Sequence, residues 1–600
     1  MRLSSSWPHL LRLLLAISLH HVAVTARAIP EIVLGPDSHG SLGAVASEAA
    51  ECSAIGRDLI ARGGNAADAL VGTTFCVGVI GMYHSGIGGG GFAIIRDAHG
   101  NYEAVDFRET APAAAHQDMY QGNVNGSIVG GLAVGVPSEV RGLEYIHKKY
   151  GVLPLEDRHA RRHPCRKKRL QRFVSRMSLK LCLIYFAQRL LTDAVSSDTV
   201  SYMERGVAGR EFNYLSQDPS FAQDFAPNGT LLGVGDIMTR KRYADQHSRK
   251  DCGTGRDAFY TGEIAEAMVK YIQQTNGSMT LEDFSSYKVL SRPVKSVRYR
   301  GVDLHTVGAP ASGAVCLNIL KTMEQFDLSD RDNVNLTAHR FAEAMRFAYG
   351  SRVELGDPDY VNGVRAFEDR MLSEVNARRI RANISDDHTQ PVEAYDPSDT
   401  YAPDGHGTSH IVTADASGMA TSLTTTINLL FGAQIMDPTS GVILNNEMND
   451  FSIPGVPNEF GFQPSEANYI RPGKRPLSSV TPVIASDPRR DGALIATVGA
   501  AGGSRIITAT AAALWHVFEH AMSMREALAE PRMHDQLMPN TVLLEYKFDN
   551  GTAASLASRG HNLTRVAEGL SAVQGIMMLD DGVFEAASEP RQRNSAGFTI

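Results

Sequence analysis

The sequence predicts a mixed α/β (α+β) fold in which antiparallel strand pairs alternate with helices. Residues 410–415 alternate between the two faces of a strand, Asp415-Ala-Ser-Gly418 forms a turn, and residues 419–423 return as the second strand of a hairpin. Residues 92–96 and 102–107 form a second predicted hairpin, joined by a turn that contains Gly100. We expect this second hairpin to place Arg108 at its far end.

Three segments are predicted to be helical. Residues 46–61 and 66–79 form two neighbouring helices that are separated at Gly63-Gly64. Residues 505–518 form the third helix, which follows the apolar run 493–498 and the pair Gly502-Gly503. A strand is therefore expected to pass into a helix at this glycine pair.

The composition is that of a large globular protein. The 600 residues are 43% hydrophobic, which is enough for an extensive core, and their net charge is −8. A negative net charge gives no general attraction for nucleic acid, so no nucleic-acid partner is expected. Length alone would allow several domains, but the chain has no internal repeat.

The N-terminal residues 1–28 are typical of an export signal. Arg2 precedes the apolar run 10–19, and Ala26-Arg-Ala28 resembles a signal cleavage site. A spanning helix needs about 20 apolar residues, and Arg12 interrupts this run, so we favour a cleaved signal over a membrane anchor. We expect the secretory pathway, with a secreted or cell-surface protein, a vacuolar protein or an anchored protein as the alternatives; no other membrane span is expected.

Asn-x-Ser/Thr sequons fit a secretory route, because this tripeptide is the acceptor for N-glycosylation. The candidate sites are Asn125, Asn228, Asn276, Asn335, Asn383, Asn550 and Asn562.

A glycine-rich stretch, Gly86-Ile-Gly88-Gly-Gly-Gly91, satisfies the literal pattern of a dinucleotide-binding loop. Such a loop follows a strand and opens a helix, whereas this stretch leads into the predicted strand 92–96. We therefore expect no NAD, no FAD and no other cofactor. No Cys/His cluster has the spacing of metal ligands, so no metal is expected either.

Thr408 is the candidate nucleophile. It follows Gly405-His-Gly407 at the start of the predicted strand 410–415. A threonine hydroxyl is a weak nucleophile without a neighbouring base. Cleavage of the chain just before the threonine would supply that base, because the new α-amine has a pKa of about 7.7–8.0. Taken alone, the stretch is more typical of a turn that leads into a strand.

Further motifs surround Thr408 in a fixed order. They are Ser85-Gly-Ile-Gly-Gly-Gly-Gly-Phe92, Asp106-Phe-Arg108-Glu109, Thr426-Ile-Asn428-Leu-Leu-Phe-Gly432, Leu444-Asn-Asn-Glu447-Met-Asn-Asp450-Phe-Ser452, Arg475-Pro-Leu-Ser478-Ser479 and Val498-Gly-Ala-Ala-Gly502-Gly503. With these motifs the chain resembles the γ-glutamyltransferases (γ-glutamyltranspeptidases, glutathione hydrolases), a family of N-terminal-nucleophile hydrolases. The resemblance extends from about residue 43 to 144 and from about residue 202 to the C-terminus.

The resemblance implies a four-layer αββα sandwich, in which two mostly antiparallel sheets pack face to face and helices cover both outer faces. Thr408 would begin an inner strand of one sheet. The precursor would cleave itself before Thr408 into a large subunit, residues 29–407, and a small catalytic subunit, residues 408–600, which remain one unit. Thr408 Oγ would then form an ester with the γ-glutamyl group of a substrate such as glutathione, and water or an amino-acid or dipeptide acceptor would resolve it.

The family pattern also assigns a role to each matching residue. The catalytic residues would be the nucleophile Thr408, its hydrogen-bond partner Thr426, and Gly502 and Gly503, whose N–H groups would bind an oxyanion. The residues that bind the substrate's α-carboxylate would be Arg108, Ser478 and Ser479, and those that bind its α-ammonium would be Asn428, Glu447 and Asp450. An arginine fork suits a carboxylate, and carboxylate and amide oxygens suit an ammonium. Outside the family context, Glu447 and Asp450 would fit a solvated turn.

The resemblance further implies a disulfide between Cys52 and Cys76. Six cysteines are too few for a disulfide scaffold in a chain of 600 residues. The remaining cysteines are unassigned: Cys165, Cys182, Cys252 and Cys316.

Residues 156–198 depart from the family pattern as an anomalous insert. They contain the basic run 159–169 and the apolar run 177–186. Three interpretations are open: a patch that binds nucleic acid or a membrane, a solvated insertion, or an error in the coding sequence. We favour the error, because both flanks keep the register of the family.

Two other functions stay open from the sequence. A cephalosporin-acylase-like amidase would share the fold, but a glutaryl side chain has no α-ammonium for Asn428, Glu447 and Asp450 to bind. An unprocessed, catalytically silent secreted binding protein would result if the insert prevented maturation.

Overall fold

The computed structural model describes residues 40–153, 193–209, 212–243, 258–327, 333–395, 407–456 and 464–600. The predicted signal 1–28 and most of the anomalous insert 156–198 lie outside these ranges. Within the described ranges, no helix combines the length and the apolar character needed to cross a bilayer.

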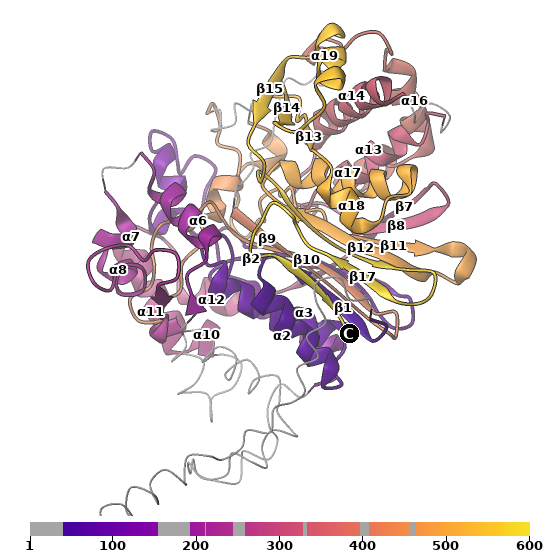
Figure 1. The fold of residues 1–600 in the computed structure, drawn as a ribbon. Helices are drawn as coiled ribbons and strands as arrows, with labels where there is room; N and C mark the ends of the chain where they lie inside the picture. The colour runs from indigo at the N-terminus through magenta and orange to yellow at the C-terminus, as the bar shows by residue number, and fades with distance from the viewer. Residues whose placement is uncertain are drawn as a thin grey trace, which may run out of the picture. The chain divides into compact units, whose positions relative to one another are not determined.

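Two antiparallel sheets form the centre of the fold (Figure 1). The first has seven strands in the spatial order β18 (Ala596–Thr599), β1 (Gly43–Ser47), β9 (Gly407–Asp415), β10 (Ala420–Asn428), β2 (Gly90–Arg96), β3 (Tyr102–Phe107) and β6 (Leu290–Arg292). The second has six strands in the order β17 (Phe584–Ala587), β16 (Ala572–Met578), β12 (Ala493–Ala501), β11 (Val483–Asp487), β8 (Val302–Val307) and β7 (Val294–Tyr299). The central strands β9 and β10 of the first sheet pack against β12 of the second.

Helices cover the outer face of each sheet, so the predicted four-layer αββα sandwich is confirmed. The layer on the seven-stranded sheet consists of α2 (Ala50–Ala61), α3 (Ala66–Ile80) and α4 (Glu139–Tyr150). On the six-stranded sheet lie α13 (Gly313–Met323), α17 (Arg505–His520) and α18 (Met524–Ala529), and α14 (Val334–Arg352) packs on α13.

Shorter elements surround these four layers. The remaining α-helices are α6 (Ser197–Val207), α7 (Tyr214–Gln217), α8 (Pro219–Phe225), α10 (Ala258–Thr261), α11 (Glu263–Gln274), α12 (Leu281–Ser286), α15 (Val364–Met371), α16 (Glu374–Asn383) and α19 (Asn550–Ser558). The small sheets are β13 (Met533–His534) with β14 (Val542–Glu545) and β15 (Leu563–Val566), and β4 (Asp193–Ala194) with β5 (Ile237–Met238).

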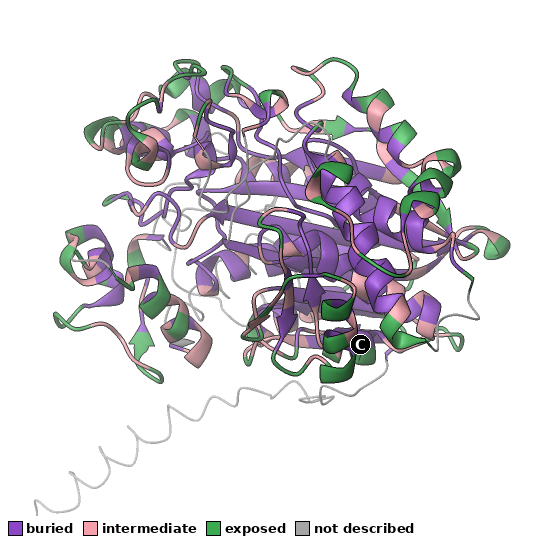
Figure 2. Ribbon diagram, turned by 90° about the horizontal axis from the view of Figure 1, so that it is seen from above, coloured by how far each residue is buried: buried purple, intermediate pink, exposed green. Residues whose placement is uncertain are grey.

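The central strands are buried on both faces, as Figure 2 shows. In β2, Phe92 and Ile94 belong to the core between the sheets, whereas Ala93 and Ile95 belong to the core beneath the helices. Because successive side chains of a strand point to opposite faces, each strand contributes to two cores. A central strand therefore has no face exposed to water.

The same alternation determines which face of β9 carries the side chain of Thr408. In β9, Val412 and Ala414 belong to the core between the sheets, and Ile411 belongs to the core beneath the helices. A period of two places Thr408 and His410 on the face of Val412, toward the second sheet. The prediction that Thr408 begins an inner strand is confirmed, because β9 lies between β1 and β10.

Most of the predicted elements are confirmed, and one boundary is wrong. The two predicted hairpins are β9–β10 and β2–β3, and the helices predicted at 66–79 and 505–518 are α3 and α17. The helix predicted at 46–61 begins only at Ala50. Residues 43–47 instead form β1, because pairing with β9 and β18 on both sides supplies the hydrogen bonds of their backbone.

Candidate active site

Thr408 and Thr426 lie opposite each other on the paired strands β9 and β10. The Thr426 hydroxyl donates a hydrogen bond to the carbonyl oxygen of Gly407 and accepts one from the N–H of Asn428 at 2.7 Å. The ladder is irregular between Thr426 and Asn428, and Asn428 has a φ of 72°. Thr426 therefore contacts the peptide group that joins Gly407 to Thr408.

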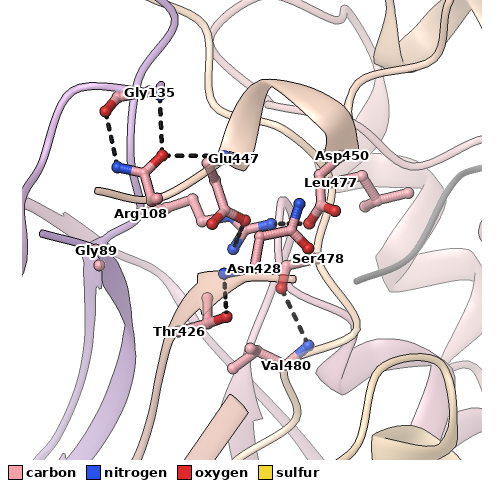
Figure 3. A network of polar contacts seen from close by, with 12 residues as sticks. Gly89, Arg108, Gly135, Thr426, Asn428, Glu447, Asp450, Leu477, Ser478 and Val480 are labelled. Atoms are coloured by element: carbon pink, nitrogen blue, oxygen red, sulfur yellow. Dashed lines mark hydrogen bonds and ion pairs between the residues drawn. The ribbon is translucent and has the colours of Figure 1, made fainter. Parts of the chain in front are cut away.

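Arg108 follows directly after β3, so the prediction that a hairpin positions it is confirmed. Its side chain is buried and forms ion pairs with Glu447 and Asp450, at the two ends of the 3-10 helix η9 (Glu447–Asp450). Figure 3 shows Arg108 and the two carboxylates of η9 converging with Asn428, from the end of β10, and Ser478, from the loop before β11. The groups assigned to the two ends of a zwitterionic substrate thus contact each other directly.

Several buried polar atoms of this cluster have no hydrogen-bond partner within the described part of the chain. Among them are Arg108 Nε and two oxygen atoms, Asn428 Oδ1 and Asp450 Oδ1. Buried polar atoms are normally hydrogen-bonded, so such atoms indicate where a ligand is received. Arg108 Nε can only donate, as a carboxylate requires, and the two oxygens can accept from an ammonium.

The cluster contains more buried carboxylates than Arg108 can neutralise. Burial raises the pKa of Glu447 and of Asp450, although the Arg108 charge opposes this shift. Burial also raises the pKa of Glu109 to about 8. Burial alone would lower the pKa of Arg108, but Glu447 and Asp450 more than offset this and raise it. A cationic group bound here would favour the ionised carboxylates.

Ser478 and Ser479 lie in the loop that precedes β11. Ser478 Oγ accepts a hydrogen bond from the N–H of Val480 at 3.3 Å, and Ser479 Oγ accepts one from Arg352 Nη2 at 3.0 Å. Arg352 is buried at the end of α14 and also donates from Nε to Ser312 Oγ at 3.1 Å. It therefore holds the serine pair in place.

Two residues of this region are absent from the sequence-based prediction. Glu109 belongs to the motif Asp106-Phe-Arg108-Glu109, but the motif assigns it no role. Only its full burial beside Arg108 indicates that it contributes to the charge balance of the cluster. Arg352 is separated from Ser479 by 127 residues, and no local motif marks it.

Gly502 and Gly503 form the predicted passage from a strand to a helix, between β12 and α17. Their φ angles are 126° and 64°, which favour glycine. A Cβ atom at Gly502 would lie 2.5 Å from the carbonyl oxygen of Leu570. Backbone N–H groups at the start of a helix are suited to bind an oxyanion, and this role of the pair stays a prediction.

The predicted disulfide is confirmed: Cys52 and Cys76 are bonded at 2.02 Å and join α2 to α3. Cys316 is a buried thiol in α13, and Cys165, Cys182 and Cys252 lie outside the described residues. Every sequon asparagine is exposed, which is compatible with glycosylation, and their modification stays a prediction.

A threonine at the start of an inner strand, between two sheets covered by helices, is the arrangement that the N-terminal-nucleophile class of hydrolases uses. The chain belongs to the gamma-glutamyltranspeptidase family, whose pattern matches residues 52–159 and 184–599. The unmatched residues 160–183 lie inside the anomalous insert 156–198. An error in the coding sequence as the origin of the insert stays a prediction.

Curated relatives match almost the whole chain. A glutathione hydrolase proenzyme of Arthroderma benhamiae is 47% identical over 94% of this chain and 93% of its own length. A glutathione hydrolase of Aspergillus flavus is 43% identical over 93% of this chain and 89% of its own length.

Solved structures show the same fold. A cephalosporin acylase from Bacillus halodurans has a TM-score of 0.77 at 22% identity and covers 96% of this chain and 99% of its own. At this identity the likeness concerns the fold alone. The gamma-glutamyltranspeptidase of Helicobacter pylori has a TM-score of 0.50 at 31% identity and covers 57% of this chain and 92% of its own.

Proposed function

We propose that this protein is a γ-glutamyltransferase and glutathione hydrolase that matures by cleavage between Gly407 and Thr408. The new α-amine of Thr408 would act as the base for its own hydroxyl. The hydroxyl would attack the γ-carbonyl carbon of a γ-glutamyl compound and release the amine or peptide. Water or the amino group of an amino acid or dipeptide would then take the glutamyl group from the ester.

The unpartnered atoms of the buried cluster support this substrate class most directly. Arg108 Nε offers a donor for an α-carboxylate, and Asn428 Oδ1 and Asp450 Oδ1 offer acceptors for an α-ammonium. A glutamyl group carries its α-carboxylate and its α-ammonium on the same carbon atom, and this cluster has a partner for each.

A substitution of the nucleophile tests the maturation. We expect Thr408→Ala to remain a single chain on a denaturing gel and to release no amine from a γ-glutamyl anilide, because it lacks the attacking hydroxyl. The matched variant Thr408→Ser keeps a hydroxyl and should still be cleaved, at a lower rate. If Thr408→Ala is cleaved and active, another residue is the nucleophile.

Paired substrates separate this proposal from the cephalosporin-acylase-like alternative. A glutaryl anilide differs from a γ-glutamyl anilide only by the missing α-ammonium. A site built to hydrogen-bond a polar group can reject an analogue without that group by about 10⁴–10⁵-fold, so we expect kcat/KM to be at least about 100-fold higher for the γ-glutamyl anilide. Equal values for the two anilides would favour the acylase.

We also propose the secretory pathway as the route of this protein, supported by the N-terminal residues 1–28 and the exposed sequons. N-terminal sequencing of the purified protein tests both cleavages at once. A large subunit that begins near residue 29 and a small subunit that begins at Thr408 are expected. A single sequence without the Thr408 terminus would favour the silent, unprocessed protein.

A further inference from the structure

A buried group of two histidines and one glutamate lies in the helical layer outside the six-stranded sheet. His339 and Glu343 are one turn apart on α14, and His561 follows α19; Figure 1 shows α14 and α19 in the same part of the fold. A spacing of four residues places His339 and Glu343 on the same face of a helix. One nitrogen of each histidine and one carboxylate oxygen all lie within 4.8 Å of one another.

The distances between these atoms are close to those of a metal site. His339 Nδ1 lies 2.8 Å from His561 Nε2, and His561 Nε2 lies 3.8 Å from Glu343 Oε1. Tetrahedral zinc has bonds of about 2.0–2.1 Å to nitrogen and oxygen, which places its ligand atoms about 3.3 Å apart. These two distances lie on either side of this value, and the His339 nitrogen lies within 4.8 Å of the Glu343 oxygen, so modest side-chain rearrangements would bring all three atoms to one metal ion.

The surroundings hold each of these side chains in an orientation that suits a metal. His339 Nε2 donates to the carbonyl oxygen of Ser385 at 2.7 Å, which leaves the Nδ1 lone pair directed at the cluster. The hydroxyls of Thr389 and Tyr395 donate to the two Glu343 oxygens at 2.7 and 2.6 Å. Metal-bound histidines usually donate their second N–H to a carbonyl or carboxylate, and metal-bound carboxylates are usually hydrogen-bonded as well.

A hydrogen bond links the two histidines, and its proton can move to another nitrogen when a metal binds. In the hydrogen-bonded arrangement, His561 donates its Nε2 proton to His339 Nδ1. No residue in the described part of the chain bonds His561 Nδ1, so this nitrogen can take the proton when Nε2 binds a metal.

We infer that His339, Glu343 and His561 form a binding site for a divalent metal ion of the zinc class, with water as a fourth ligand. Two imidazoles and one carboxylate are a common zinc ligand set. The sequence itself predicts no metal here, because His561 lies 222 residues after His339. Since His339 and Glu343 precede Thr408 and His561 follows it, the metal would also join the two subunits of a cleaved chain.

Metal binding by the full-length protein tests this inference without any assay of activity. After dialysis against a weak chelator, we expect the protein to bind about one equivalent of zinc per chain, measured by mass spectrometry. Added zinc should raise the midpoint of thermal unfolding by a few degrees. Cobalt should give the visible absorption of a tetrahedral site with nitrogen and oxygen ligands.

Two substitutions and one control locate the metal. His561→Gln removes the imidazole but keeps an N–H for His339 Nδ1, and Glu343→Gln keeps an acceptor for the hydroxyl groups but removes the charge. Each should weaken zinc binding by at least about tenfold. The control His99→Gln, at the exposed turn of the β2–β3 hairpin, should bind zinc like the unchanged protein.

The inference is overturned if the unchanged protein binds no stoichiometric zinc and shows no change in its unfolding midpoint. It is equally overturned if His561→Gln and Glu343→Gln bind zinc as tightly as His99→Gln. Should the two variants fail to fold, the cobalt spectrum of the unchanged protein decides, because it reports the ligand atoms directly.

Discussion

The Thr426 hydroxyl donates a hydrogen bond to the carbonyl oxygen of Gly407, and from this contact we propose a role for Thr426 in the proposed maturation. In that cleavage Thr408 Oγ would attack the Gly407 carbonyl carbon, and the carbonyl oxygen would gain negative charge. A hydrogen-bond donor at that oxygen stabilises the charge, and the loss of one such donor typically slows a reaction by about 10²–10³-fold. In this proposal, Thr426 would act on the bond between Gly407 and Thr408 during maturation.

We therefore expect Thr426→Val to slow conversion of the precursor by about 100-fold or more. Valine has nearly the shape of threonine, but its side chain cannot donate a hydrogen bond. Thr426→Ser keeps the hydroxyl and serves as the control, with cleavage near the rate of the unchanged protein. The rate is followed as the loss of the intact chain on denaturing gels over time. Cleavage of the valine variant at the normal rate would contradict this role.

Glu139 is a buried carboxylate at the start of α4 that accepts a hydrogen bond from Thr425. Burial raises its pKa from 4.5 to about 7, although the hydrogen bond opposes the shift. Between these two pKa values the folded protein holds a proton that the unfolded chain releases. The contribution of Glu139 to stability is therefore present at low pH and is lost as the pH rises toward 7.

Glu139→Gln should remove the part of the pH dependence of stability that comes from Glu139. Relative to the unchanged protein, the variant should gain stability as the pH rises from 5 to 8, by at most about 3 kcal/mol at 1.36 kcal/mol per pKa unit. The midpoint of thermal unfolding across this pH range measures the effect. Glu282→Gln, at an exposed position, is the control. A difference between Glu139→Gln and the unchanged protein that does not vary with pH would refute the assignment.

The connection between β12 and α17 is the element that depends most strictly on glycine. A Cβ atom at Gly502 would lie 2.5 Å from the carbonyl oxygen of Leu570 and 2.7 Å from Ser571 Cα. Both neighbours are backbone atoms and cannot turn aside as a side chain can. Any larger residue must therefore displace the turn, together with its N–H groups.

Gly502→Ala should consequently lower kcat/KM by at least about tenfold per mole of cleaved protein, as expected when an oxyanion donor is displaced. Gly229→Ala is a matched control, because Gly229 also has a positive φ, of 82°, but a Cβ there would meet nothing within 4 Å. The control should cost about 1–2 kcal/mol of stability and leave kcat/KM unchanged. Normal activity of Gly502→Ala would show that the N–H groups of this turn are not required.

At the scale of the whole molecule, each sheet contains strands from both sides of Gly407. In the seven-stranded sheet, β1 lies between β18 and β9, and β10 pairs with β2. In the six-stranded sheet, β11 pairs with β8. Separation of the two subunits would break these ladders and expose the cores on both faces, so cleavage of one peptide bond should not release them.

We expect the two fragments of the cleaved protein to elute together in gel filtration under native conditions and to separate only in denaturant. Thr408→Ala, as one continuous chain, should elute at the same volume. Elution of the fragments at two native volumes would contradict the pairing of β1 with β9 and of β10 with β2 across the two subunits.

Local patterns in the sequence were sufficient for several elements. The alternation in 410–415 and 92–96 predicted strands that are confirmed, because side chains of a strand alternate between faces. The prediction for 46–61 was wrong at its start. Residues 43–47 join β9 and β18, and such pairing between distant segments leaves no local periodic signal.

The chain by itself determined the family, through the order of its motifs. It also determined the approximate positions of many helices and strands, because these depend on residues that are close in the sequence. Only the tertiary structure decided that Arg108 pairs with Glu447 and Asp450, that Arg352 holds Ser479, and that His339 meets His561. These contacts join residues more than a hundred positions apart in the sequence. Their partners are chosen by the packing of whole layers, which no local pattern encodes.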